Sequence, residues 1–119
     1  MKDHTSLVAW QEARVTVLLV IRASRDHWKP WAGALFGQLQ RASLSVQLNI
    51  AEGATFGRSP TYTRHLGIAY GSAVETGELI RVAVDSSILP IPLGKELQLH
   101  SDQTRHLLLG LLKRHRPMR

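Results

Sequence analysis

The stretch QLQRASLSVQLNIAEG, residues 38–53, carries the strongest structural signal in the chain. Its apolar residues recur every three or four positions, which places them on one face of a helix of about 3.6 residues per turn. With one residue that precedes the stretch, this core face consists of Leu35, Leu39, Ala42, Val46, Ile50 and Gly53. A second set has the same spacing and lies a quarter turn or more away. We call it the polar stripe, and it consists of Gln38, Arg41, Ser45, Asn49 and Glu52. The helix is therefore expected to meet a polar partner as well as a hydrophobic core.

The rest of the chain supplies three more helices, separated by short segments rich in proline, glycine or serine. The predicted helices span residues 6–25, 34–54, 60–85 and 93–114. Ser6 is expected to cap the first helix, while Ser59 and Pro60 suit the cap and the first position of the third. Short connections favour antiparallel neighbours, so the sequence predicts an all-α, antiparallel up-down four-helix bundle formed by one domain of residues 1–119.

Two further patterns concern packing. Helical spacing in the first helix is kept by Leu7, Trp10, Arg14 or Val15, Val17 or Leu18, and Ile21. One face of the third helix is shared by Tyr62, Leu66, Ala69, Ala73, Gly77, Ile80 and Val84. A glycine inside a helix costs about 1 kcal/mol relative to alanine. Gly67, Gly71 and Gly77 are therefore expected to let another helix approach closely, and a ligand pocket is the alternative.

The composition bounds the function. The chain has 15 Lys and Arg against 9 Asp and Glu, a formal net charge of +6. An excess of this sign attracts polyanions such as nucleic acids, although it can also serve solubility alone. The absence of cysteine excludes disulfides and thiolate metal sites. The chain shows no signal-peptide pattern and no apolar run of about 20 residues, so we expect a cytoplasmic protein with no membrane partner.

No pattern typical of a catalytic, metal or cofactor site emerges. The six histidines show neither an i, i+4 pair nor a Glu-x-x-His motif, so no metal site is expected. The chain also lacks a nucleophile elbow, a Walker loop and a dinucleotide fingerprint. We therefore expect no cofactor and no enzymatic activity. The remaining catalytic hypothesis places a site around Asn49, Glu52 and Glu75.

The polar stripe has two interpretations. As a structural feature, it is a network within the chain or between subunits, for which Arg58, Arg64 and Arg81 are available partners. As a functional feature, it lines a groove for a polar ligand or nucleic acid. Leu44 and Leu48 lie on a third face of the same helix, opposite the core face. A second apolar patch on a core helix usually marks a subunit contact.

Basic residues are densest in the tail of residues 113–119. Contacts with nucleic-acid phosphates are predicted for Lys113, Arg114, Arg116 and Arg119. No helix-turn-helix signature accompanies them. Trp28 and Trp31 flank Pro30 before the second helix, where they either cover the end of the core or form a stacking platform for a base.

Four pieces of the chain resemble one known family. They are LVAWQEA at residues 7–13, QLQRASLSVQLNIAEG at residues 38–53, GRS at residues 57–59 and IAYGSAVE at residues 68–75. Together they resemble the bacterial four-helix-bundle proteins encoded in intervening sequences of 23S rRNA genes. The resemblance implies an antiparallel bundle that assembles as a ring-like homopentamer without established enzymatic activity. Some members accompany diversity-generating retroelements, where they bind reverse transcriptase and nucleic acid through a basic surface.

The recurring polar positions of that family carry over to this chain with some departures. The matching residues are Gln38, Arg41, Ser45, Asn49, Glu52, Arg58, Gly71, Ser72 and Glu75. Gly77 stands where the family often has a second glutamate, and Glu78 follows one position later. The proline or alanine common near Gln47 is missing. These departures affect the polar network and not the expected fold.

Three functional hypotheses follow. The first is a non-catalytic oligomeric bundle that binds RNA or DNA without sequence preference or by shape, because five copies at +6 would carry about +30. The second is a structural adaptor that presents its ring to a protein partner. The third, ranked last, is the enzyme described above.

Overall fold

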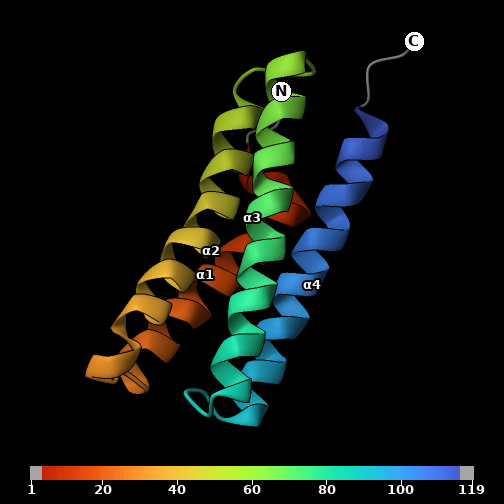
Figure 1. Cartoon of the computed structure of the whole chain (residues 1–119). Coiled ribbons are helices and arrows are strands. Elements are labelled where there is room, and N and C mark those ends of the chain that lie inside the picture. The colour runs from red at the N-terminus through yellow and green to blue at the C-terminus, as the bar shows by residue number, and fades with distance from the viewer. Residues whose placement is uncertain (1–3, 116–119) are drawn as a thin grey trace.

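The computed structural model describes residues 4–115, and four long helices account for most of them (Figure 1). They are α1 (Val8–Asp26), α2 (Gly33–Ala54), α3 (Pro60–Asp85) and α4 (Ile91–Arg114). Short 3₁₀ helices, His4–Ser6 and Pro30–Ala32, precede α1 and α2. No strand occurs in this part of the chain, which confirms the all-α prediction.

Each helix packs against two others, so that the four form a closed square. α2 lies between α1 and α3, and α4 lies between α3 and α1. Consecutive helices run in opposite directions. The start of α1, the α2–α3 connection and the end of α4 therefore lie at one end of the bundle (Figure 1). The molecule is elongated, with principal extents of 47 × 25 × 22 Å.

The first residues of the helices test the caps and helix starts that the sequence predicts. Ser59 Oγ accepts a hydrogen bond from the Tyr62 backbone N–H at 3.2 Å, so the predicted cap of α3 is confirmed. The predicted Ser6 cap is wrong, because α1 begins after Leu7 and Ser6 lies in the preceding 3₁₀ helix. α4 begins at Ile91 and not at residue 93. Its first turn tolerates Pro92 because no intrahelical N–H bond is needed there.

The core face predicted from residues 38–53 is confirmed. Leu39 and Ile50 are fully buried, and the other members of the face are buried except Leu35, which is half-buried. These side chains join two hydrophobic clusters. One lies toward the α2–α3 connection and includes Ile50, Leu66 and Leu108, and the other includes Phe36 and Leu39.

A layer of hydroxyl side chains lies between the two clusters. All four helices contribute to it, and its members are Thr16, Ser43, Thr76, Ser101 and Thr104. They help to line a cavity of about 10 Å³. Thr76 Oγ1 donates to the Ser72 carbonyl at 2.8 Å. Such bonds to the preceding helical turn satisfy buried hydroxyls without a partner from another helix.

α1 buries small and hydroxyl-bearing residues in preference to its largest apolar ones. Its buried residues are Ala9, Ala13, Thr16, Val17, Val20, Ala23 and Ser24. Val15, Leu18 and Ile21, which keep helical spacing in the sequence, are exposed. Small side chains allow α1 to lie close to its neighbours, and spacing alone cannot distinguish this face from the adjacent one.

The helical glycines divide into tight and open positions. Gly77 is buried, and a Cβ there would lie 3.3 Å from Gln98 Nε2 of α4, as the close-approach prediction requires. That prediction is wrong within this chain for Gly67 and Gly71. Both are exposed, and among the described residues no neighbouring heavy atom lies within 4 Å of an added Cβ.

Candidate functional site

The polar stripe contacts α3, and its first part joins three side chains. Gln38 Nε2 donates to Glu75 Oε2 across the α2–α3 seam. Arg41 donates to Gln38 Oε1 from Nε at 3.3 Å and from a terminal guanidinium nitrogen at 3.1 Å. The Gln38 amide thereby links the Arg41 cation to the Glu75 carboxylate without a direct ion pair between them.

The second part of the polar stripe lies nearer the α2–α3 connection. The Ser45 and Ser72 hydroxyls are 2.8 Å apart. Asn49 Nδ2 donates to the Ser45 carbonyl at 2.9 Å, and Asn49 Oδ1 lies 2.9 Å from His65 Nδ1. The oxygen accepts, so the hydrogen of the His65 ring sits on Nδ1. The sequence analysis did not identify His65 as a member of this group. The Asn49 side chain was the available signal, because an amide at a contact between two helices needs a polar partner.

Two of the arginines that were available as partners for the acids of the polar stripe contact other residues in this chain. Among the described residues the Glu52 carboxylate makes no hydrogen bond or ion pair. Arg58 contacts the end of α4 and no acid, and Arg81 pairs with Glu78 at 2.9 Å. Within the described part of this chain, therefore, none of Arg58, Arg64 and Arg81 pairs with an acid of the polar stripe, and the partner of Glu75 is the Gln38 amide. Pairing of these arginines between subunits stays a prediction.

Arg58 ties the α2–α3 connection to the end of α4. Its Nε donates to His115 Nδ1 at 3.2 Å, and its terminal nitrogen donates to the Arg114 carbonyl at 3.4 Å. Thr63 Oγ1 donates to the His115 carbonyl at 3.2 Å. Burial lowers the pKa of the His115 imidazole below its ordinary value, and the charges of Arg58 and Arg114 lower it further. The neutral ring can therefore accept the Arg58 hydrogen bond.

Four cations gather at this end of the bundle, and we call them the basic end: Arg58, Arg64, Lys113 and Arg114. Within residues 4–115 none of them forms an ion pair. Glu52 is the one carboxylate in the segments that form this end, which are residues 4–11, 52–64 and 111–115. Two of the predicted phosphate contacts, Lys113 and Arg114, thus lie in the last turn of α4. The other two, Arg116 and Arg119, lie outside the described residues.

The opposite end has nearly balanced charge. Its segments, residues 22–33 and 78–96, hold the cations Arg22, Arg25, Lys29, Arg81 and Lys95 and the acids Asp26, Glu78, Asp85 and Glu96. Arg25 pairs with Asp26 at 3.3 Å. The excess of positive charge in the described chain is thus concentrated at the other end.

Aromatic side chains are exposed at both ends. Trp28 stacks on Phe36 with ring centroids 5.9 Å apart, so it covers part of the core, whereas Trp31 is 69% exposed. At the basic end, Phe56 is 53% exposed and lies parallel to the His65 ring. Sequence reasoning singled out the tryptophans and missed Phe56.

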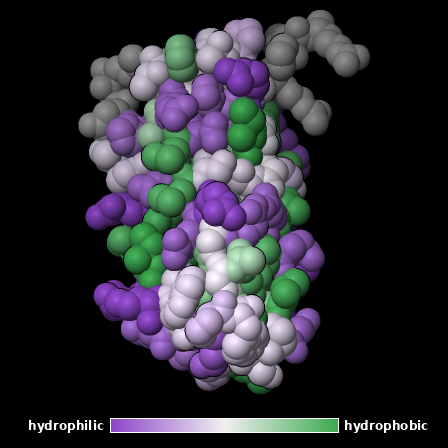
Figure 2. Space-filling model, turned by 60° about the vertical axis from the view of Figure 1, so that its left-hand side comes forward, coloured by the Kyte–Doolittle hydropathy of each residue, from purple (hydrophilic) through white to green (hydrophobic). Residues whose placement is uncertain are grey.

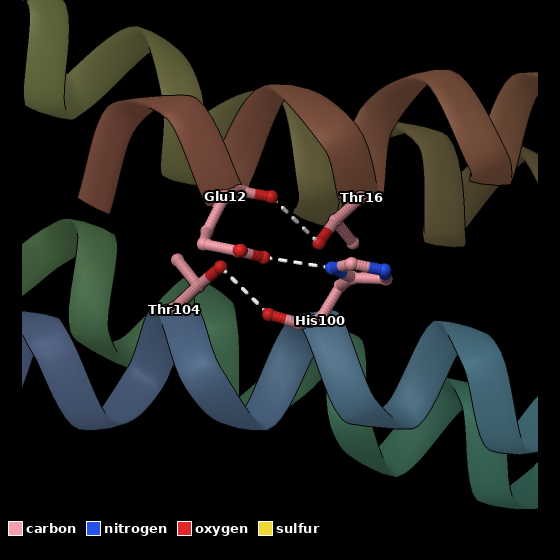
Figure 3. A network of polar contacts seen from close by, with 4 residues as sticks. All are labelled: Glu12, Thr16, His100 and Thr104. Carbon is pink, nitrogen blue, oxygen red and sulfur yellow. Dashed lines mark hydrogen bonds and ion pairs between the residues drawn. The ribbon is translucent and has the colours of Figure 1, made fainter. Parts of the chain in front are cut away.

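A third polar group joins α1 to α4 (Figure 3). His100 Nδ1 lies 2.7 Å from Glu12 Oε2, and each side chain is about a quarter exposed. Thr16 Oγ1 and Thr104 Oγ1 donate to the Glu12 and His100 carbonyls at 3.1 and 2.8 Å. Beside this pair an open groove of about 510 Å³ is lined by Val8, Glu12, Leu99, Asp102, Gln103, Arg105, His106 and Leu107.

The sequence that forms these four helices matches a known family. Residues 5–110 match the 23S rRNA-intervening sequence protein family. The chain belongs to that family. Its fold is similar to a crystal structure from Bacteroides thetaiotaomicron, a protein of unknown function from the S23 ribosomal protein family, with a TM-score of 0.79. The alignment has 17% identity and covers 89% of this chain and 96% of the other. No curated protein gave a significant match.

Membership in the 23S rRNA-intervening sequence family assigns no chemistry to the site. In residues 4–115 no group of three or more histidine or acidic side chains is placed to hold a metal ion. None of the four helices described is both long and apolar enough to cross a membrane. The residues with a distinctive arrangement are therefore the polar stripe, the basic end and the Glu12–His100 pair.

Proposed function

We propose that this protein is a non-catalytic helical bundle that binds RNA or DNA through the basic end. The observation that carries the proposal is the set of four cations without ion pairs at one end of an otherwise charge-balanced bundle. Cations that are not neutralised by the protein can displace counterions from phosphates, which is the main source of affinity in nonspecific nucleic-acid binding. Family membership is consistent with this function but does not by itself assign it.

One cation of the basic end is held in place before any ligand arrives. Arg58 is held by two bonds to the end of α4, and Lys113 and Arg114 extend from the last turn of the same helix. Cations fixed on helix ends lose less conformational entropy on binding than cations on a flexible chain. The bundle itself, and not only the tail of residues 113–119, therefore supplies the binding surface.

A titration of fluorescent RNA hairpins and single-stranded DNA at two salt concentrations tests the proposal. We expect binding at low salt that weakens strongly at the higher concentration. The paired change Arg58→Glu and Arg64→Glu should weaken binding by about tenfold or more. Deleting residues 116–119 should leave most of the affinity.

The matched control carries Arg22→Glu and Lys29→Glu, which alter the same number of charges at the opposite end. This control should retain more affinity than the Arg58 and Arg64 variant. Equal loss in the two variants would show that net charge, and not the basic end, is responsible. No binding of the unaltered protein at low salt would refute the proposed function.

The proposal includes self-association, which two exposed apolar surfaces favour. One is the outer face of α2 and α3, with Leu44, Leu48 and Ile68, and the other is the groove between α1 and α4, with Val8 and Leu99. The square order of the helices puts these surfaces on opposite sides of the bundle. In the view of Figure 2, hydrophobic side chains extend along the length of the molecule among hydrophilic ones. Two different apolar surfaces suit a head-to-tail contact, which closes into a ring when the rotation permits, as in the expected homopentamer.

The same apolar surfaces support a second candidate function, an adaptor that binds a protein partner. An adaptor would retrieve one specific protein in a pull-down even after nuclease treatment. It would also retain that partner when Arg58 and Arg64 are replaced by glutamate. Retrieval that disappears with nuclease would favour the nucleic-acid function instead.

A further inference from the structure

Phe56 is a large apolar side chain that the bundle leaves 53% exposed. It lies in the short connection between α2 and α3 and belongs to neither hydrophobic cluster. The His65 ring lies beside it in an offset, nearly parallel arrangement, with ring centroids 5.9 Å apart and planes 7° from parallel. The rest of the ring remains accessible to a planar ligand.

The support beneath Phe56 is rigid. His65 is 9% exposed, and its Nδ1 is bound to Asn49 Oδ1 at 2.9 Å. Gly53 permits this packing, because a Cβ at that position would lie 2.7 Å from His65 Cβ. The Phe56 backbone N–H donates to the Gly53 carbonyl at 3.0 Å. The last polar contact of the polar stripe thus holds the ring on which Phe56 stacks.

One cation of the basic end, Arg58, follows Phe56 by two residues in the same connection. Gly57, with φ +61°, turns the chain between Phe56 and Arg58, and Arg58 is fixed by its bonds to His115 and the Arg114 carbonyl. An exposed ring next to fixed cations is the combination that binds single strands, in which bases stack on the ring and phosphates meet the cations. A duplex offers its phosphates but keeps its base faces covered.

We propose that Phe56, supported by His65, is a stacking platform for an unpaired base, and that the basic end consequently prefers single-stranded nucleic acid to duplex. This inference rests on the proposed function and adds the form of nucleic acid that the site selects. Trp31 is the competing platform because it is more exposed. It lies, however, at the end where cations and acids nearly balance.

The test compares Phe56→Leu with the unaltered protein, using a labelled 12-nucleotide thymidine strand and a DNA hairpin duplex in fluorescence anisotropy. Leucine keeps an apolar side chain but removes the aromatic face. We expect single-strand affinity to fall about tenfold and duplex affinity to change by less than about twofold. Trp31→Leu is the matched control and should change neither affinity.

A second variant distinguishes loss of the aromatic ring from any loss of folding stability caused by Phe56→Leu. Phe56→Trp should bind the strand as tightly as the unaltered protein. Its fluorescence should also be quenched by thymidine strands beyond the quenching shown by the unaltered protein. Equal losses on strand and duplex for Phe56→Leu, or no loss on either, would overturn the platform while leaving the proposed function intact. Binding to neither ligand by the unaltered protein would refute both proposals.

Discussion

Gly53 and Gly71 occupy helical positions under opposite constraints. An added Cβ at Gly53 would lie 2.7 Å from His65 Cβ and 3.1 Å from Tyr62 Cδ1, whereas one at Gly71 would meet no heavy atom within 4 Å in the described chain. Gly53→Ala should lower the free energy of unfolding by about 1–3 kcal/mol through overpacking. Gly71→Ala should raise it by up to about 1 kcal/mol through helix propensity. Urea denaturation of the two variants measures both changes, and a Gly53→Ala variant at least as stable as the unaltered protein would contradict the packing described for Gly53.

His115 should titrate below the ordinary range of a histidine. Its pKa is lowered by burial first and by Arg58 and Arg114 next. The folded state therefore resists protonation relative to the unfolded chain. The neutral ring stabilises the fold at pH values above the unfolded pKa of about 6.5. That stabilisation is lost as the pH falls through this value toward the lower folded pKa.

The pKa of His115 can be followed by an NMR titration of its ring protons. Arg58→Ala should raise this pKa toward the ordinary value, because it removes a neighbouring positive charge. Arg22→Ala, at the opposite end of the bundle, should leave it in place. A His115 pKa at or above about 6.5 in the unaltered protein would show that the Arg58 contact does not form in solution.

At the scale of the helices, Glu12 and His100 join the first and last elements of the bundle (Figure 3). The double-mutant cycle of Glu12→Ala and His100→Ala should give a coupling energy of about 1 kcal/mol, because both groups are about three-quarters buried and 2.7 Å apart. Chemical denaturation of the four proteins supplies the cycle. A coupling within about 0.3 kcal/mol of zero would mean that the pair adds nothing beyond its separate packing.

The elements differ in how much of them the sequence could predict. The core face of α2 and the Ser59 cap of α3 depend on residue spacing and on a local bond, so both are found from the sequence. The face of α1 is set by which neighbours can approach small residues such as Ala9 and Ala13, and spacing holds no information on that. The predicted start of α4 at residue 93 leaves out Ile91 and Pro92, because a proline breaks a helix interior but is accepted in its first turn.

The candidate site was predictable in its residue types and not in its pairings. The polar stripe was recognised from its spacing, but the choice of Gln38 for Glu75 depends on the register of two helices. The contacts of Arg58 with His115 and of Asn49 with His65 join residues 57 and 16 positions apart. Their geometry follows from the assembled bundle. The exposure of the Phe56 ring could not be predicted from the sequence, because it depends on which residues pack around it in the folded bundle.

For the whole molecule, the apolar surfaces predict association in solution. The unaltered protein should sediment as an oligomer at micromolar concentration, and Leu48→Asp or Leu99→Asp should each reduce its mass by disrupting one surface. A monomeric mass for the unaltered protein would contradict the ring.

Mixing variants distinguishes a head-to-tail contact from a two-fold one. A Leu48→Asp protomer keeps an intact α1–α4 groove, and a Leu99→Asp protomer keeps an intact α2–α3 face. In a head-to-tail assembly, equal amounts of the two should therefore form a heterodimer and stop there. A two-fold contact through either surface would produce no such mixed species.

The salt dependence of nucleic-acid binding distinguishes phosphate contacts at the basic end from attraction by net charge alone. The slope of log Kd against log salt for a single strand counts the phosphates that the cations neutralise, at about 0.7 per contact. Replacing Arg58 and Arg114 by glutamine should reduce that slope by about 1.4, while the same change at Arg22 and Lys29 should leave it unaltered. This result would place the phosphate contacts at the basic end. An equal slope in all three proteins would contradict that placement, and with it the account of what this bundle does.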